Sequence, residues 1–315
     1  MHRRTFLRYA TGAAVGSLGL AAIAKTSTPS LPQTSRLGCT TVSFRQRFAK
    51  TRPKDADAGG PELSLLDVPA FFAGQLGIRN VEVWSKHFAE ATPAYGEKLR
   101  TAAERAGTRI INVQHDEPPF DLCDRDEAKR RASLESTQRW IEVAAACGAP
   151  SLRANTGGRP NDPFVLATAV ESFRRLAEHG ERLGVKILVE NHGGHSANVE
   201  NVAAIVAGVK SPWCWTLPDF GNFPADLAIE ARLNRLQRIL PQAALISAKG
   251  AEFDANYRHV SFDVAACVRA AEKAGFRGIY SVELWAANYL ASDPERAVKT
   301  IADTIERELG AVRSP

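Results

Sequence analysis

Apolar and polar positions follow two alternating patterns along most of the chain, one typical of strands and one typical of helices. A short apolar run with strand character is followed by a polar loop, and then by a longer stretch with apolar positions at helical spacing. This unit repeats eight times from Leu37 onward. The predicted strands are 37–44, 80–84, 109–114, 151–155, 186–191, 214–219, 244–249 and 278–284, and the predicted helices lie near 63–76, 93–106, 124–147, 162–183, 198–208, 225–240, 261–274 and 293–309.

Glycine marks several joints between a helix and the next strand. Gly77, Gly107 and Gly148 each follow the last apolar position of a predicted helix, where a left-handed terminator is expected. Eight strands alternating with eight helices over about 275 residues predict an α/β protein, a (βα)8 TIM barrel. A doubly wound sheet shows the same alternation, but no glycine-rich phosphate loop follows the first strand. The insertion 45–62 would then lie at the catalytic end, as a lid.

The N-terminus has the pattern of a targeting segment. A twin-arginine sequence, Arg3–Arg8, precedes a weakly apolar run that ends in the small-x-small sequence Ala22-Ile23-Ala24. A retained membrane anchor is the alternative, although a run of about 16 residues is short of the roughly 20 that a membrane span needs. We therefore predict a cleaved twin-arginine signal peptide and a protein exported to the periplasm or beyond.

These boundaries divide the chain into three parts. The signal peptide covers 1–24, a Ser-, Thr- and Pro-rich linker covers 25–36, and a single barrel domain covers 37–310. No second apolar run follows, so no stable membrane span is expected after cleavage. The sequence leaves an oligomer open.

Charge and cysteine usage narrow the function classes. The formal net charge is +5, but the chain carries no acidic residue before Asp55, so the basic residues near the N-terminus supply much of the excess and the barrel itself is nearly neutral. A nucleic-acid partner is therefore not expected. The five cysteines form no C-x-x-C pair, which argues for packed thiols and against a disulfide framework or a zinc–cysteine site.

Polar residues end several predicted strands, where a TIM barrel builds its active site. Because side chains alternate along a strand, Glu190 points with Leu188, and Glu283 points with Ser281. These two acids and Asp219 would repel one another on one rim unless a cation lies between them. Oxygen ligands favour Mn²⁺ or Mg²⁺, whereas a histidine ligand would admit Zn²⁺ or Co²⁺. The alternative is a set of structural ion pairs with neighbouring basic residues.

Four motifs, in order and with their spacing, carry a resemblance to a known family. Glu190-Asn191-His192-Gly193-Gly194, Leu217–Phe223, Ser247-Ala248-Lys249 and Ser281-Val282-Glu283 resemble the xylose-isomerase-like superfamily of sugar-phosphate isomerases and epimerases, in particular an exported subgroup. That family holds a metal with Glu, Asp, His and Glu from strands five to eight. The resemblance implies metal ligands at Glu190, Asp219 and Glu283, while Ser247 stands near the place of the family's histidine and Asn222 also stands where relatives often have histidine.

The resemblance implies a metal-dependent sugar isomerase or epimerase that moves a proton next to a carbonyl through an enediolate. Glu190 and Glu283 would remove and return the proton, and Lys249 would stabilise the oxyanion. A small sugar-like substrate would contact strand-end residues, which we expect to be Glu82, Trp84, His115, Arg153, Asn155, His192 and Trp285.

Three other functions remain open at this point. A lyase or hydrolase of 3-keto-glycosides would use the same proton abstraction but would lose a β-substituent. A nuclease of the endonuclease IV type would need a histidine-rich metal cluster and a basic surface, and this sequence has neither. A non-catalytic periplasmic sugar-binding barrel is the third alternative, and the missing strand-seven histidine is the feature that favours it.

Overall fold

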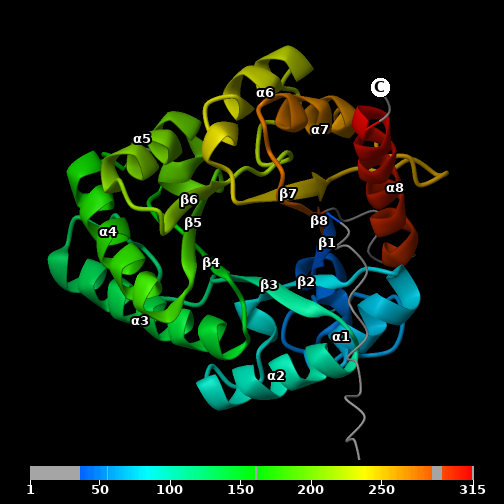
Figure 1. The fold of residues 1–315 in the computed structure, drawn as a ribbon, viewed down its shortest axis with the longest axis horizontal. Helices are drawn as coiled ribbons and strands as arrows, with labels where there is room; N and C mark the ends of the chain where they lie inside the picture. The colour runs from blue at the N-terminus through cyan, green and yellow to red at the C-terminus, as the bar shows by residue number, and fades with distance from the viewer. Residues whose placement is uncertain (1–35, 55, 160–161, 286–292, 314–315) are drawn as a thin grey trace, which may run out of the picture. The chain divides into compact units, whose positions relative to one another are not determined.

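The structure, a computed structural model, describes residues 36–54, 56–159, 162–285 and 293–313. The predicted signal peptide and all of the linker except Arg36 lie outside the described residues. In the rest of the chain, strands and helices alternate in the predicted order, and Figure 1 shows the helices arranged around the strands. Among the described residues, no helix is long and apolar enough to cross a membrane.

The strands are short and the helices are of ordinary length. The strands are β1 (Leu37–Thr40), β2 (Asn80–Trp84), β3 (Arg109–Gln114), β4 (Ser151–Ala154), β5 (Lys186–Glu190), β6 (Cys214–Leu217), β7 (Leu245–Gly250) and β8 (Ile279–Leu284). The α-helices are α1 (Val68–Phe71), α2 (Pro93–Arg105), α3 (Glu127–Ala146), α4 (Leu166–Leu183), α5 (Val199–Val209), α6 (Ile229–Leu236), α7 (Val264–Lys273) and α8 (Pro294–Arg313).

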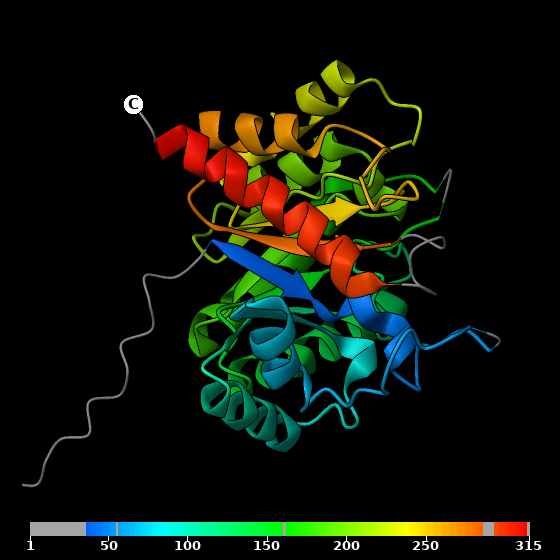
Figure 2. The same ribbon diagram turned by 90° about the vertical axis from the view of Figure 1, so that its right-hand side faces the viewer.

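All paired strands run parallel, and the sheet closes on itself. The ladder order is β6-β5-β4-β3-β2-β1-β8-β7. The gap between β6 and β7 is closed by backbone hydrogen bonds, including Ser247 N to Pro218 O at 3.0 Å and Phe220 N to Ser247 O at 3.0 Å. Figure 2, at right angles to Figure 1, shows α8 lying across β1 and β8. The predicted TIM barrel is confirmed.

The core has two layers, because successive residues of each strand face opposite sides. A small cluster of Ile111, Leu188, Leu217 and Leu245 lies among strand residues, whereas a much larger cluster packs the strands against the surrounding helices. Leu188 belongs to the small cluster and its neighbour Val189 to the large one. The parity argument for β5 therefore holds, and it places Glu190 on the same side as Leu188.

The first unit departs most from the predicted boundaries. Strand β1 ends at Thr40 instead of Phe44, because the Thr40 hydroxyl accepts a hydrogen bond from Val42 N at 3.3 Å and caps a 3-10 helix over Thr41–Arg47. The helix expected near 63–76 is only the short α1 followed by a π-helical turn, Phe72–Leu76, which ends at Gly77 with φ of 68°. Apolar periodicity alone does not separate these tight turns from an α-helix.

Candidate active site

A cleft of about 530 Å³ opens at the carboxyl ends of the strands. Its lining comes from loops and strand ends all around the barrel: Val42, Trp84, Lys86, Asp116, Phe120, Arg153, Asn155, Gly157, Gly158, His192, Gly193, Gly194, Asn222, Lys249, Glu283 and Trp285. This is where a TIM barrel carries its chemistry. Six of the predicted site residues line the cleft directly: Trp84, Arg153, Asn155, His192, Lys249 and Trp285, together with Glu283 from the predicted acid triad.

The three predicted metal ligands lie together next to this cleft. Glu190 ends β5, Asp219 follows β6, and Glu283 lies in β8; one carboxylate oxygen from each lies within 4.8 Å of the others. All three side chains are buried. Oδ2 of Asp219 is buried and makes no hydrogen bond to any described residue. Three buried carboxylates, one of them with an oxygen that accepts no hydrogen bond from the described residues, fit a divalent cation, and an oxygen donor set of this kind does not by itself select one metal.

Backbone and side-chain hydrogen bonds hold Asp219 in place. The Asn191 side chain binds the main chain of Asp219: its Oδ1 accepts a hydrogen bond from Asp219 N at 2.7 Å, and its Nδ2 donates one to Asp219 O at 3.0 Å. Oδ1 of Asp219 accepts from the backbone N–H groups of Gly221 and Asn222 at 2.7 and 2.8 Å. The turn after β6 thus uses one carboxylate oxygen for its own structure and leaves the other facing the triad.

Lys249, at the end of β7, places a cation inside the triad. Its Nζ lies 2.6 Å from Glu283 Oε1, 3.6 Å from Asp219 Oδ2, and 3.0 Å from Asn222 Oδ1. Burial alone would lower the pKa of Lys249, but the charges of Asp219, Glu283 and Glu190 outweigh burial and raise it above the ordinary value. Lys249 is therefore held as an ammonium ion.

The two glutamates of the triad have different surroundings. Burial raises the pKa of Glu190 well above its ordinary value. Burial acts on Glu283 in the same direction, but the Lys249 ammonium and a 2.8 Å hydrogen bond from the Gln114 amide outweigh it and lower the pKa of Glu283. Gln114 is itself fixed by the Thr40 hydroxyl, which donates to Gln114 Oε1 at 2.6 Å. The surroundings thus shift the pKa values of the two glutamates in opposite directions.

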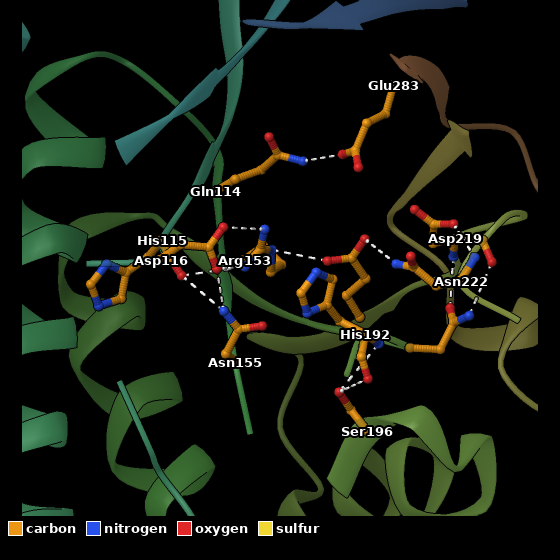
Figure 3. A network of polar contacts seen from close by, with 12 residues as sticks. Gln114, His115, Asp116, Arg153, Asn155, His192, Ser196, Asp219, Asn222 and Glu283 are labelled. Atoms are coloured by element: carbon orange, nitrogen blue, oxygen red, sulfur yellow. Dashed lines mark hydrogen bonds and ion pairs between the residues drawn. The ribbon is translucent and has the colours of Figure 1, made fainter. Parts of the chain in front are cut away.

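Arg153 joins the triad to a second acidic group, Asp116. Its Nε lies 3.0 Å from Glu190 Oε2, and its Nη1 and Nη2 lie 2.5 and 3.1 Å from the two Asp116 oxygens. Trp84 Nε1 and the Asn155 amide also donate to Asp116. Burial would raise the pKa of Asp116, but Arg153 keeps it below its ordinary value. Figure 3 shows this network, with Asp116, Arg153 and Asn155 gathered on one side of His192 and the Asp219 turn on the other.

Two tryptophans form an aromatic wall of the cleft. Trp285 is 50% exposed, and its ring packs edge to face against Trp84 with 6.3 Å between centroids. The Arg45 guanidinium covers the Trp285 ring at 4.1 Å and holds it in place. The exposed part of the Trp285 indole, which lies beside polar groups, suits the apolar face of a sugar ring.

His115 and Glu82, two of the expected substrate contacts, are not among the residues that line the cleft. His115 is fully buried, and its ring lies 5.6 Å from that of Trp140 in α3. Side chains alternate, so His115 points outward between the inward-facing Gln114 and Asp116. Glu82 is also fully buried, bonded by the Asn112 amide at 2.7 Å, one layer below Trp84. Burial raises the pKa of Glu82 to about 7.

Asp116, Gln114 and Asn222 contact the predicted site residues but were not among the residues predicted from the sequence. The parity rule that located Glu190 would have pointed to Gln114 at the end of β3 and to Asp116 two residues later, because they alternate with His115. Asn222 donates to Glu190 Oε1 at 3.4 Å and accepts from Lys249. No local pattern could have predicted that bridge, because it joins three separate strand ends.

Comparison with known proteins agrees with this architecture. A family model described as "Xylose isomerase-like TIM barrel" matches residues 72–308. The chain belongs to this family. The match spans most of the barrel, including all three acids of the triad, so the family resemblance predicted from four motifs is confirmed. No curated protein matches the sequence significantly.

Several solved structures share the fold at low sequence identity. The IolI protein, crystallised with a bound zinc atom, superposes with a TM-score of 0.67 at 16% identity, covering 89% of this chain and 100% of that one. The 3-keto-D-glucoside 4-epimerase YcjR from E. coli gives 0.60 at 14%, covering 90% and 100%. D-psicose 3-epimerase with D-fructose gives 0.60 at 14%, covering 80% and 93%.

Proposed function

We propose that this protein is a sugar isomerase or epimerase that moves a proton next to a carbonyl group. The observation that carries the proposal is a pair of neighbouring buried glutamates, Glu190 and Glu283, of which Glu283 lines a cleft with an aromatic wall. Two carboxyl groups near one carbon can remove a proton and return it to the same or the neighbouring position. The family and the similar structures, which include two sugar epimerases, support this class.

Each side chain has a role that follows from its contacts. Glu283 accepts hydrogen bonds from Lys249 and Gln114, which favours its carboxylate, so we assign proton removal to Glu283 and proton return to Glu190. Lys249 would stabilise the oxyanion that forms when the proton leaves. Arg153 and Asn155 hold Asp116 in the cleft wall, where its carboxylate can accept hydrogen bonds from sugar hydroxyls.

Glu190, Asp219 and Glu283 would hold a divalent ion, with Mn²⁺ or Mg²⁺ favoured by their oxygen ligands over Zn²⁺ or Co²⁺. When bound, such an ion polarises a carbonyl and its neighbouring hydroxyl as a Lewis acid. We also propose export by the twin-arginine route, which makes a free sugar or keto-sugar a better candidate substrate than a sugar phosphate.

Deuterium exchange tests the proposal. The protein is incubated in D₂O with Mn²⁺ and a panel of sugars and 3-keto-sugars, and incorporation at carbon is followed by NMR. We expect exchange with at least one substrate, and a loss of about 100-fold or more in Glu283→Gln and Glu190→Gln. Glu117→Gln, which changes a glutamate that does not line the cleft, is the matched control and should keep the wild-type rate.

The same assay separates the alternatives. Release of the aglycone from a 3-keto-glycoside would assign elimination in place of isomerisation. Sugar binding without exchange, for every compound of the panel, would overturn the proposed reaction and favour a binding protein.

A further inference from the structure

Lys249 lies where an incoming metal ion would have to bind. Its ammonium is 2.6 Å from a Glu283 oxygen and 3.6 Å from the free oxygen of Asp219. A divalent ion takes oxygen ligands at about 2.0–2.6 Å. An ion among the triad oxygens would therefore be in close contact with the ammonium, and the two cations would repel each other.

We propose that Lys249 is the resident cation of the acid triad, and that the ammonium and a divalent ion exclude each other. Lys249 must swing out before Glu283 and Asp219 can both bind a metal. This inference rests on the proposed function only in taking the triad as the metal site.

The hydrogen bonds of Glu283 indicate which donor, Lys249 or Gln114, would leave when a metal ion binds. Lys249 donates to Oε1 and Gln114 to Oε2, so neither Glu283 oxygen is without a donor. Gln114 is fully buried, and its Oε1 accepts a hydrogen bond from the Thr40 hydroxyl at 2.6 Å. Lys249 hangs on a flexible four-carbon stem that borders the open cleft. The lysine can leave with little rearrangement, whereas Gln114 cannot.

The chain makes room for the lysine at its present position. The stem passes over Gly221, where an added Cβ would lie 3.0 Å from both Cβ and Cγ of Lys249. Asn222 Oδ1, one residue further on, accepts from the ammonium at 3.0 Å. The turn that contains Asp219 therefore also provides the contacts of the Lys249 side chain in its present position.

A swing of the Lys249 side chain would lead into the open cleft, which Lys249 lines. Nζ already lies 6.0 Å from the Trp285 ring centroid, and half of the Trp285 side chain is exposed. The Arg45 guanidinium lies over the same ring at 4.1 Å, so the displaced ammonium would be hydrated in the cleft and would not take the ring as its new partner.

Metal titration of the full chain tests the proposal. Mn²⁺ binding is measured by calorimetry, and by the EPR signal of free Mn²⁺, for the wild type and for Lys249→Met, which keeps an unbranched stem. We expect Lys249→Met to bind Mn²⁺ tighter by about tenfold or more, the range in which groups beside metal ligands change affinity. Lys86→Met is the matched control: Lys86 lines the same cleft, lies 5.2 Å from the Trp84 ring, and should leave Mn²⁺ affinity unchanged.

Equal or weaker Mn²⁺ binding by Lys249→Met would overturn the proposal, as would a crystal of the wild-type protein with Mn²⁺ in the triad and Lys249 unmoved. Lys249→Gln replaces the methionine variant if the latter does not fold. These measurements need no turnover, so they are independent of the deuterium-exchange result. A protein that fails to exchange deuterium but gains Mn²⁺ affinity in Lys249→Met would support the cation exchange and overturn only the proposed reaction.

Discussion

The surroundings of His87 predict how the stability of the protein changes at acid pH. The ring is only 4% exposed and stacks on Phe48 with 3.7 Å between centroids. Its nitrogens lie 2.9 Å from the Thr41 hydroxyl and 3.0 Å from the Thr51 hydroxyl, and no carboxylate is bonded to it. Burial, with a smaller effect of Arg45, lowers the pKa of His87 to about 3.

The direction of the effect follows from proton binding in the two states. The unfolded chain takes up a proton on His87 near the ordinary pKa of about 6.5, whereas the folded protein does not until near pH 3. The contribution of the neutral His87 ring to the free energy of unfolding is thus fully present above about pH 6.5, and it is lost as the pH falls toward 3. The loss is about 2 kcal/mol at pH 5, and at most about 5 kcal/mol below the folded pKa.

Urea unfolding of wild type and His87→Gln at several pH values measures this contribution. Glutamine does not titrate, so the stability difference between the two proteins should shrink by about 2 kcal/mol from pH 7 to pH 5. His179→Gln is the comparison, because the His179 ring is partly exposed and its pKa is lowered less far; its effect should be smaller. A wild-type minus His87→Gln difference that stays constant over this range would refute the reasoning.

Two further changes have clear expected outcomes. Arg153→Met leaves the buried carboxyl of Glu190 and the partly buried carboxyl of Asp116 without their shared cation, so urea unfolding should show a loss of about 3–5 kcal/mol. Arg175→Met, at an exposed ion pair, should cost less than about 1 kcal/mol, and similar costs for the two variants would contradict the network. Replacing both Arg3 and Arg4 by lysine should leave the protein in the cytoplasm on cell fractionation, while Arg8→Lys should not, and export of the double variant would argue against the twin-arginine route.

Local sequence was enough for the barrel and for half of the site. Eight repeats of apolar strand, loop and amphipathic helix specify a (βα)8 barrel because each unit can bury its apolar surface only by packing in that order. Strand-end position and parity then placed Glu190 and Glu283 on one rim, because the alternation of side chains is a local property of the backbone. The predicted strand 214–219 and the family motifs both pointed to Asp219, which lies just past the end of β6 in a turn where strand parity no longer applies.

Tertiary structure decided what surrounds those acids. The path of β3 against α3 decided where His115 lies: its ring is 5.6 Å from that of Trp140 and does not line the cleft. The bridge from Glu283 through Lys249 and Asn222 to Glu190 joins strand ends 93 positions apart in sequence, a pairing that no local pattern encodes. The sequence placed three acids and a lysine at the same end of a barrel; only closure of the barrel brought the ammonium among the carboxylates, because contacts between distant segments arise when the whole chain packs.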